Sequence, residues 1–164
     1  MKKIIISLLA TLMIGSAIMG CSSKESKDEA TKNISTSDIV NKILKEVETR
    51  ATAPVEGDLA KEQYHLNLDD IEEFSIQNGM INTGLESVAV VKAKDGKVDS
   101  VKASLEKVKE DKKAAAFYPG EPEAVEAAEI KVVGNYVGLF IIPDYEEGQK
   151  NSEKAVSVFE SLLK

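Results

Sequence analysis

Two apolar runs joined by a Gly-Asn pair constrain the fold of this chain more than any other feature. Residues 130–133 precede Gly134 and Asn135, and residues 136–142 follow them. Such a pair between two strand-like runs is typical of a tight β-hairpin, because glycine adopts the backbone angles that two-residue turns require. Residues 88–91 form another apolar, largely β-branched run with the composition of a buried strand. Short connections between strands predict an antiparallel sheet.

Amphipathic patterns predict helices beside this sheet. Apolar residues recur at helical spacing over 36–50, 97–117 and 151–163, and a short helix is expected over 123–128. Ser35 and Asp38 have the spacing of a capping box at the first helix start. An additional strand is expected over 73–77. The pattern predicts an α+β fold of two layers, in which helices cover one face of a small, mostly antiparallel sheet of about four strands.

The N-terminal segment has the three-part layout of a secretory signal. Two lysines follow Met1, residues 4–19 are apolar, and a small residue precedes Cys21, the only cysteine. The apolar stretch is shorter than the roughly 20 residues that a membrane-spanning helix needs. A cysteine at this position is typical of a bacterial lipoprotein, in which the thiol receives a diacylglyceryl group. Met19 is bulkier than the residue usually found there.

Lipidation of Cys21 would divide the chain into three parts. These are a signal peptide (1–20), a lipidated flexible tether (21–34) and a single α+β domain (35–164). Two or three fatty acyl chains such as palmitate, at about 0.8 kcal/mol per buried CH₂, anchor a protein stably. We therefore predict localisation at the cell membrane, on its extracytoplasmic face.

Composition argues against several classes of function. The formal charge of −7 becomes −9 once the two lysines of residues 1–20 are removed, so binding to nucleic acid is not expected. His65 is the only histidine and tryptophan is absent, which leaves few groups for metal chelation or sugar stacking. No catalytic motif such as a Gly-x-Ser-x-Gly elbow occurs. We expect a protein that is not an enzyme and uses no cofactor or metal.

Two acidic clusters leave calcium binding or acid–base chemistry open. The first contains Asp69, Asp70, Glu72 and Glu73, and the second contains Asp144, Glu146, Glu147, Asn151 and Glu153. Acids near a helix start are also favoured by the helix dipole, which explains the first cluster without a ligand. The second lacks the spacing of an EF-hand loop.

Four residues are candidates for a ligand or partner surface: Tyr118, Tyr136, Lys109 and Lys113. The two tyrosines adjoin predicted turns and are candidates to border a binding groove. The lysines belong to a basic helix face where an anionic partner would dock. A solvated helix face and ordinary turns explain the same residues without a function.

Three segments carry a family pattern. They are the run 86–95, an amphipathic helix that ends in Phe117-Tyr118-Pro119-Gly120-Glu121, and the run 134–142. Together they resemble a family of bacterial lipoproteins known as domain of unknown function 4358, over roughly residues 36–163. The resemblance implies an extracytoplasmic lipoprotein of Firmicutes with no established activity. One departure is the lysine-rich long helix, with Lys107, Lys109, Lys112 and Lys113 where an arginine and a glutamine facing the sheet are expected.

The leading hypothesis is a non-enzymatic lipoprotein that binds a partner protein or an envelope ligand. Two alternatives stay open, a solute-capturing lipoprotein that serves a transporter and a cell-envelope hydrolase. Solute receptors usually need two lobes, whereas this chain has the length for one domain. A hydrolase would require carboxylates that converge in one site.

Overall fold

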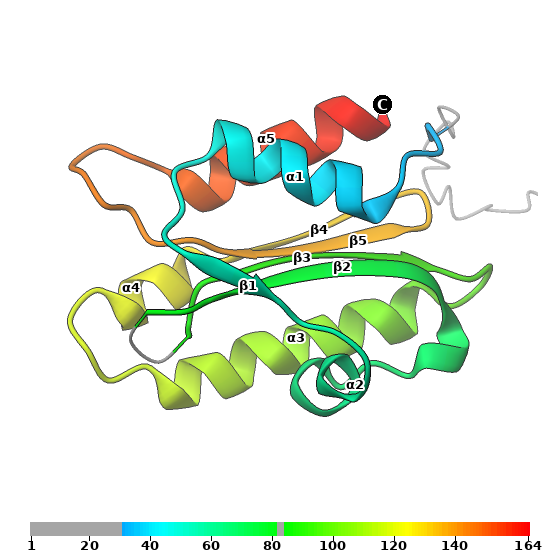
Figure 1. The fold of residues 1–164 in the computed structure, drawn as a ribbon, viewed down its shortest axis with the longest axis horizontal. Helices are drawn as coiled ribbons and strands as arrows, with labels where there is room; N and C mark the ends of the chain where they lie inside the picture. Colours follow the sequence, from blue (N-terminus) through cyan, green and yellow to red (C-terminus); the bar gives the residue numbers. More distant parts are fainter. Residues whose placement is uncertain (1–30, 82–83) are drawn as a thin grey trace, which may run out of the picture.

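The sheet has five antiparallel strands in the order β1-β2-β3-β5-β4 (Figure 1). The computed structural model describes residues 31–81 and 84–164. The strands are β1 (Thr52–Pro54), β2 (Ile71–Gly79), β3 (Ser87–Ala93), β4 (Glu129–Val133) and β5 (Tyr136–Ile141). The central strands β3 and β5 come from the most apolar parts of the sequence, as expected for strands without an exposed edge.

Helices cover both faces of this sheet. α1 (Thr36–Glu46) and α5 (Asn151–Leu163) lie on one face, whereas α2 (Asp58–Tyr64), α3 (Val98–Ala115) and α4 (Glu121–Glu126) lie on the other (Figure 1). A short 3₁₀ helix, η1 (Leu68–Asp70), precedes β2. None of the helices within residues 31–81 and 84–164 combines the length and the apolar character that a bilayer crossing requires.

The α+β class predicted from the sequence is confirmed, but two of its details differ. The helices form layers on both faces rather than one, because β3 is apolar on both sides: Val88 and Val90 pack toward α1 and α5, and Ala89 and Val91 pack toward α2 and α3. The fifth strand is the three-residue β1, whose Pro54 is tolerated because the strand lies at the sheet edge.

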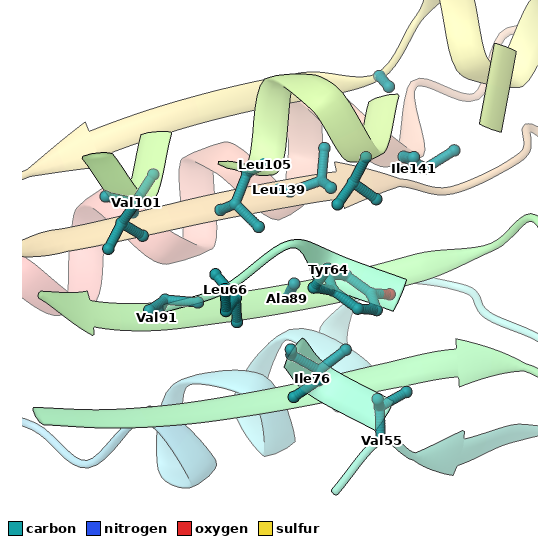
Figure 2. Close-up of a cluster of buried hydrophobic side chains, with 14 of the residues drawn as sticks. Val55, Tyr64, Leu66, Ile76, Ala89, Val91, Val101, Leu105, Leu139 and Ile141 are labelled. Carbon is teal, nitrogen blue, oxygen red and sulfur yellow. The ribbon is translucent and has the colours of Figure 1, made fainter. Parts of the chain in front are cut away.

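The larger hydrophobic cluster fills the space between the sheet and α2 and α3. Leu105 of α3 lies near Leu139 of β5, and Tyr64 and Leu66 lie over β3 (Figure 2). All four side chains are almost fully buried. Burial of a side chain of this size contributes about 1.5–3 kcal/mol, so this cluster is a major source of stability.

The second cluster lies between the sheet and the pair α1 and α5. The rings of Phe140 and Phe159 meet edge to face, with centroids 5.6 Å apart. Gly138 makes room for this arrangement, because a Cβ atom there would lie 2.5 Å from Cζ of Phe140. The absence of a side chain at Gly138 therefore lets the Phe140 ring fold back over its own strand.

Two local predictions from the sequence are confirmed. The turn between β4 and β5 contains Gly134 with a φ of +55°, and Val133 pairs with Tyr136 across it. The hydroxyl of Ser35 accepts a hydrogen bond from the backbone N–H of Asp38 at 3.1 Å and so caps α1. The hairpin and the first helix start are encoded locally.

The chain enters the domain beside the β4–β5 turn. The backbone N–H of Lys32 donates to the carbonyl of Leu163 at 3.0 Å, and the Tyr136 hydroxyl donates to the carbonyl of Ile34 at 2.8 Å. The last residues of the expected tether thus lie against the domain. The predicted signal peptide, Cys21 and the rest of the tether lie outside the described residues.

We expect Tyr64→Phe to lower the free energy of unfolding by about 1–3 kcal/mol. The buried Tyr64 hydroxyl donates to Oδ1 of Asn78 and also bonds to the hydroxyl of Ser87, which ties α2 to β2 and β3. Phenylalanine keeps the ring but leaves both partners short of a hydrogen bond. Urea denaturation measures the loss, and Tyr118→Phe, at an exposed position, is the control.

Candidate functional site

Four chain connections meet at one end of the molecule. They follow α1, β2, α3 and β5, and all lie at the left of Figure 1. The chain entry, the β4–β5 turn and the C-terminus lie at the opposite end. Successive helices and strands run back and forth along the domain. The loops are therefore divided into two groups, one at each end of the domain.

A cavity of about 260 Å³ lies among the first group of loops, and we call it the end cleft. Its lining residues are Arg50, Ile81, Leu85, Glu86, Pro119, Gly120, Glu121, Pro143, Asp144 and Tyr145. Pockets for drug-sized ligands usually measure about 300–1,000 Å³. The end cleft therefore has room for a small molecule or for one side chain of a partner.

Glu86, the residue before β3, supplies a buried carboxyl group to the end cleft and is only 6% exposed. Its Oε2 atom accepts hydrogen bonds from the backbone N–H of Arg50 at 3.3 Å and from the hydroxyl of Tyr145 at 3.1 Å. Its Oε1 atom is buried and has no hydrogen-bond partner within residues 31–81 and 84–164. The carboxyl group of Glu86 therefore lacks part of its possible hydrogen bonding, and an unpaired buried acceptor costs about 1–3 kcal/mol.

Gly79 explains how a glutamate comes to be held this deeply. The backbone N–H of Gly79 donates to the carbonyl of Glu86 at 2.8 Å. A Cβ atom at Gly79 would lie 3.0 Å from Cβ of Glu86, closer than side chains normally approach. Glycine at the end of β2 therefore permits the close packing that buries Glu86.

Arg50 and Tyr145 form one wall of the cleft together. The guanidinium carbon of Arg50 lies 4.8 Å from the centre of the Tyr145 ring, which is the geometry of a cation–π contact. Gln149 fixes the Tyr145 loop, since its Oε1 atom accepts the backbone N–H of Tyr145 at 2.8 Å. This wall is therefore held by contacts between connections that are distant in the sequence.

The other two carboxyl groups hold the backbone of neighbouring loops. Oε2 of Glu121 accepts the backbone N–H groups of Phe117 and Tyr118, both at 3.1 Å. Oδ1 of Asp144 accepts the backbone N–H of Asn151 at 2.8 Å, at the start of α5. The end cleft is therefore lined by one guanidinium and three carboxyl groups, and its walls are anchored by hydrogen bonds.

Burial raises the pKa of the Glu86 carboxyl above its ordinary value, and hydrogen bonds from Tyr145 and Arg50 oppose part of that shift. Burial, together with the negative charge of Glu86, also raises the pKa of the Tyr145 hydroxyl. The hydroxyl consequently keeps its proton at neutral pH and donates to Glu86.

This shift predicts how stability depends on pH. Because the pKa of Glu86 is higher in the folded state than the ordinary 4.5, its contribution to stability is complete below pH 4.5 and is lost as the pH rises through the raised value. Glu86→Gln removes this titration. We expect the stability of the Gln variant relative to the natural protein to increase from pH 4 to pH 7, measured by urea denaturation. A difference that stays constant over this range would contradict the assignment.

The structure places the two predicted tyrosines at opposite ends of the domain. Tyr118 is 58% exposed in the loop between α3 and α4, next to the end cleft. Tyr136 is 2% exposed, and its hydroxyl bonds to Ile34 and Asn33 near the chain entry. They therefore do not border a shared groove.

The predicted lysines lie along α3. Nζ of Lys109 donates to the carbonyl of Ala128 at 2.6 Å, which ties α3 to the chain after α4, whereas Lys113 is exposed. Nζ of Lys112 donates to the carbonyl of Gly84 at 2.8 Å, and burial lowers the pKa of Lys112 to about 8. Lys109 and Lys112 therefore have structural contacts, whereas Lys113 is exposed on the surface of α3.

The acidic clusters are engaged in local contacts. Asp70 pairs with Lys97 at 2.9 Å, and Glu72 pairs with Lys92 at 2.7 Å. Glu153 of the second cluster pairs with Lys150 at 2.7 Å. In the part of the chain that the structure describes, no three His, Cys, Asp or Glu side chains are grouped to hold a metal ion. His65 bonds to Asp111 at 2.6 Å.

The sequence reading missed Arg50, Glu86 and Tyr145 as a group. No spacing rule connects residues 50, 86 and 145, because they are distant in the sequence. A weak signal was present, because Glu86 is a charged residue directly joined to a run that forms a buried strand. A charge at such a position needs partners from elsewhere in the fold.

The fold and the end cleft together define a small α+β domain with a cavity at one end that has room for a small molecule or one side chain. A family model described as "Domain of unknown function (DUF4358)" matches residues 45–142, more than half of the chain, so the chain belongs to this family. The predicted membership in domain of unknown function 4358 is thereby confirmed over this range. The matched segment contains all five strands and the cleft residues except Pro143, Asp144 and Tyr145. No curated protein and no solved structure matches the chain.

Proposed function

We propose that this protein is an extracytoplasmic lipoprotein, anchored through Cys21, and that its domain is a non-enzymatic module that binds a ligand or partner in the end cleft. The observation that carries the proposal is the end cleft itself, a cavity with a buried and incompletely satisfied carboxyl group. A concave site lined by apolar side chains and a small number of polar groups is typical of a binding site.

The position of the cleft supports a role away from the membrane. The chain enters the domain beside Leu163 and the β4–β5 turn, whereas the cleft lies at the far end (Figure 1). A lipid on Cys21 would hold the entry end toward the bilayer. The end cleft would then face outward, where a partner or an envelope ligand can reach it.

The contacts of the cleft carboxyl groups favour binding over hydrolysis. Glu121 and Asp144 each accept backbone N–H groups and so fix the loops that carry them. A site with immobilised walls is suited to binding, because little ordering is required when the ligand enters. The single domain also favours a binding module over a two-lobed solute receptor.

Amide hydrogen exchange of the full chain tests the proposal. Exchange in membranes from the cells that make the protein is compared with exchange after purification in detergent. We expect the segments 117–121 and 142–150 to exchange more slowly in the membranes, where the ligand is present, because they form the cleft walls. Residues 101–108, in the middle of α3 and away from both the cleft and the entry end, are the internal control. Equal exchange of the cleft segments in both samples would contradict the proposal.

A further inference from the structure

We infer that the end cleft binds a primary ammonium group carried on an apolar stem, with Glu86 as its carboxylate partner. This inference rests on the proposed function, because it names the class of ligand that the same cleft takes. The stem belongs either to a lysine side chain of a partner protein or to a small free amine. The two sources share one chemistry.

The first argument is the charge of the lining. Among the described residues, the lining carries three carboxyl groups, those of Glu86, Glu121 and Asp144, and one guanidinium, that of Arg50. Arg50 is already stacked on the Tyr145 ring. A cavity with an excess of carboxyl groups attracts a cation and repels an anion.

The second argument is the unfilled bonding capacity of Glu86. Oε2 already accepts two hydrogen bonds, whereas Oε1 is without a partner among the described residues. An ammonium group is a compact donor of three hydrogen bonds and carries the charge that stabilises a buried carboxylate. A cation in the cleft would offset the desolvation that Glu86 experiences when the cleft is empty.

The third argument is the shape and the apolar part of the lining. Ile81, Leu85, Pro119 and Pro143 supply apolar walls beside the carboxyl groups. A lysine-like stem of methylene groups packs on such walls while its ammonium reaches the carboxylate. The volume of about 260 Å³ suits one such group and not a chain of sugars.

Titration of the full chain in detergent with three small probes tests the charge selectivity. The probes are 5-aminopentanol, 1,5-pentanediol and 5-hydroxypentanoate, which have a similar stem and differ in the charge of one end. Affinity is read from the backbone amide signals of Arg50 and Glu121. We expect 5-aminopentanol to bind at least ten-fold more tightly than the other two. This comparison uses the natural protein, so it does not depend on how a variant folds.

Glu86→Gln tests the role assigned to Glu86, with Glu146→Gln as the matched control. Both variants remove one negative charge from the same end, but Glu146 is exposed and does not line the cleft. We expect Glu86→Gln to weaken the binding of 5-aminopentanol about ten-fold and to leave the affinity for 1,5-pentanediol unchanged. Glu146→Gln should leave the affinities for both probes unchanged. Equal losses in the two variants would overturn the assignment of Glu86.

Binding measurements with two peptides distinguish the two sources of the ammonium group. Acetyl-Leu-Lys-Leu-amide is compared with the same peptide carrying norleucine, which lacks the ammonium. Tighter binding of the lysine peptide than of both the norleucine peptide and 5-aminopentanol supports a partner lysine, and equal binding of the lysine peptide and 5-aminopentanol supports a free amine. Equal binding of amine and diol, preference for the carboxylate, or no binding of any probe overturns the ammonium inference. The proposed function is tested independently of these probes by the hydrogen-exchange experiment, which measures whether the cleft segments are protected in membranes.

Discussion

A Phe140→Ala variant is expected to lose about 3–5 kcal/mol of unfolding free energy. Phe140 lies on the central strand β5, is fully buried and meets the ring of Phe159 edge to face. Alanine leaves a cavity between the sheet and α5, because the neighbouring side chains are held by α1 and cannot fill it. Domains of this size have a total stability of about 5–15 kcal/mol, so the loss is a large fraction of it.

Urea denaturation of the natural protein and the variant measures this loss. Phe117→Ala is the matched control, since Phe117 is the same residue type but is 78% exposed. We expect the control to change stability by no more than about 0.5 kcal/mol. Equal effects at the two positions would show that the packing described for β5 and α5 is wrong.

Cys21→Ala is expected to move nearly all of the protein from the membrane fraction to the soluble fraction. The proposed lipid anchor depends on the thiol of Cys21, and each buried CH₂ of an acyl chain contributes about 0.8 kcal/mol to membrane binding. Without the acyl chains, an acidic domain has little attraction for an anionic bilayer. Fractionation of cells followed by quantification of the protein measures the shift.

Ser22→Ala is the control for this experiment, because it alters the next residue and keeps the thiol. It should remain in the membrane fraction. Retention of Cys21→Ala in the membranes would contradict lipid anchoring at this residue. The outward orientation proposed for the end cleft would then lose its basis, whereas the fold and the cleft would be unaffected.

Elements with a local signal were predictable from the sequence. The β4–β5 turn follows from Gly134 and Asn135, and the start of α1 follows from Ser35 and Asp38, because the interactions that fix them join near neighbours in the chain. The placement of helices on both faces of the sheet was harder to predict from the sequence. The apolar run 88–91 is typical of a strand that is buried on both faces. Antiparallel sheets with one solvated face are nevertheless common, so this run alone does not place helices on both faces of the sheet.

The end cleft could not be predicted from the sequence, for a physical reason. Its polar residues Arg50, Glu86, Glu121 and Tyr145 lie on or directly beside four separate connections, and only the folded sheet brings them together. For the same reason, the sequence does not reveal that Tyr136 is buried. Its hydroxyl is bonded to Ile34, 102 positions away, and no local pattern reveals that contact.

Photocrosslinking in living cells tests most directly whether the end cleft is a binding site. A benzoylphenylalanine residue is placed at Ile81 on the cleft, and at Leu59 on α2 as the control, since the two side chains are similarly exposed, at 44% and 50%. Intact mass then reports what is attached, whether a small solute or a protein. We expect a discrete adduct at Ile81 that is lost in Tyr145→Ala and is absent at Leu59. The same products at both positions, or no adduct at Ile81, would contradict it.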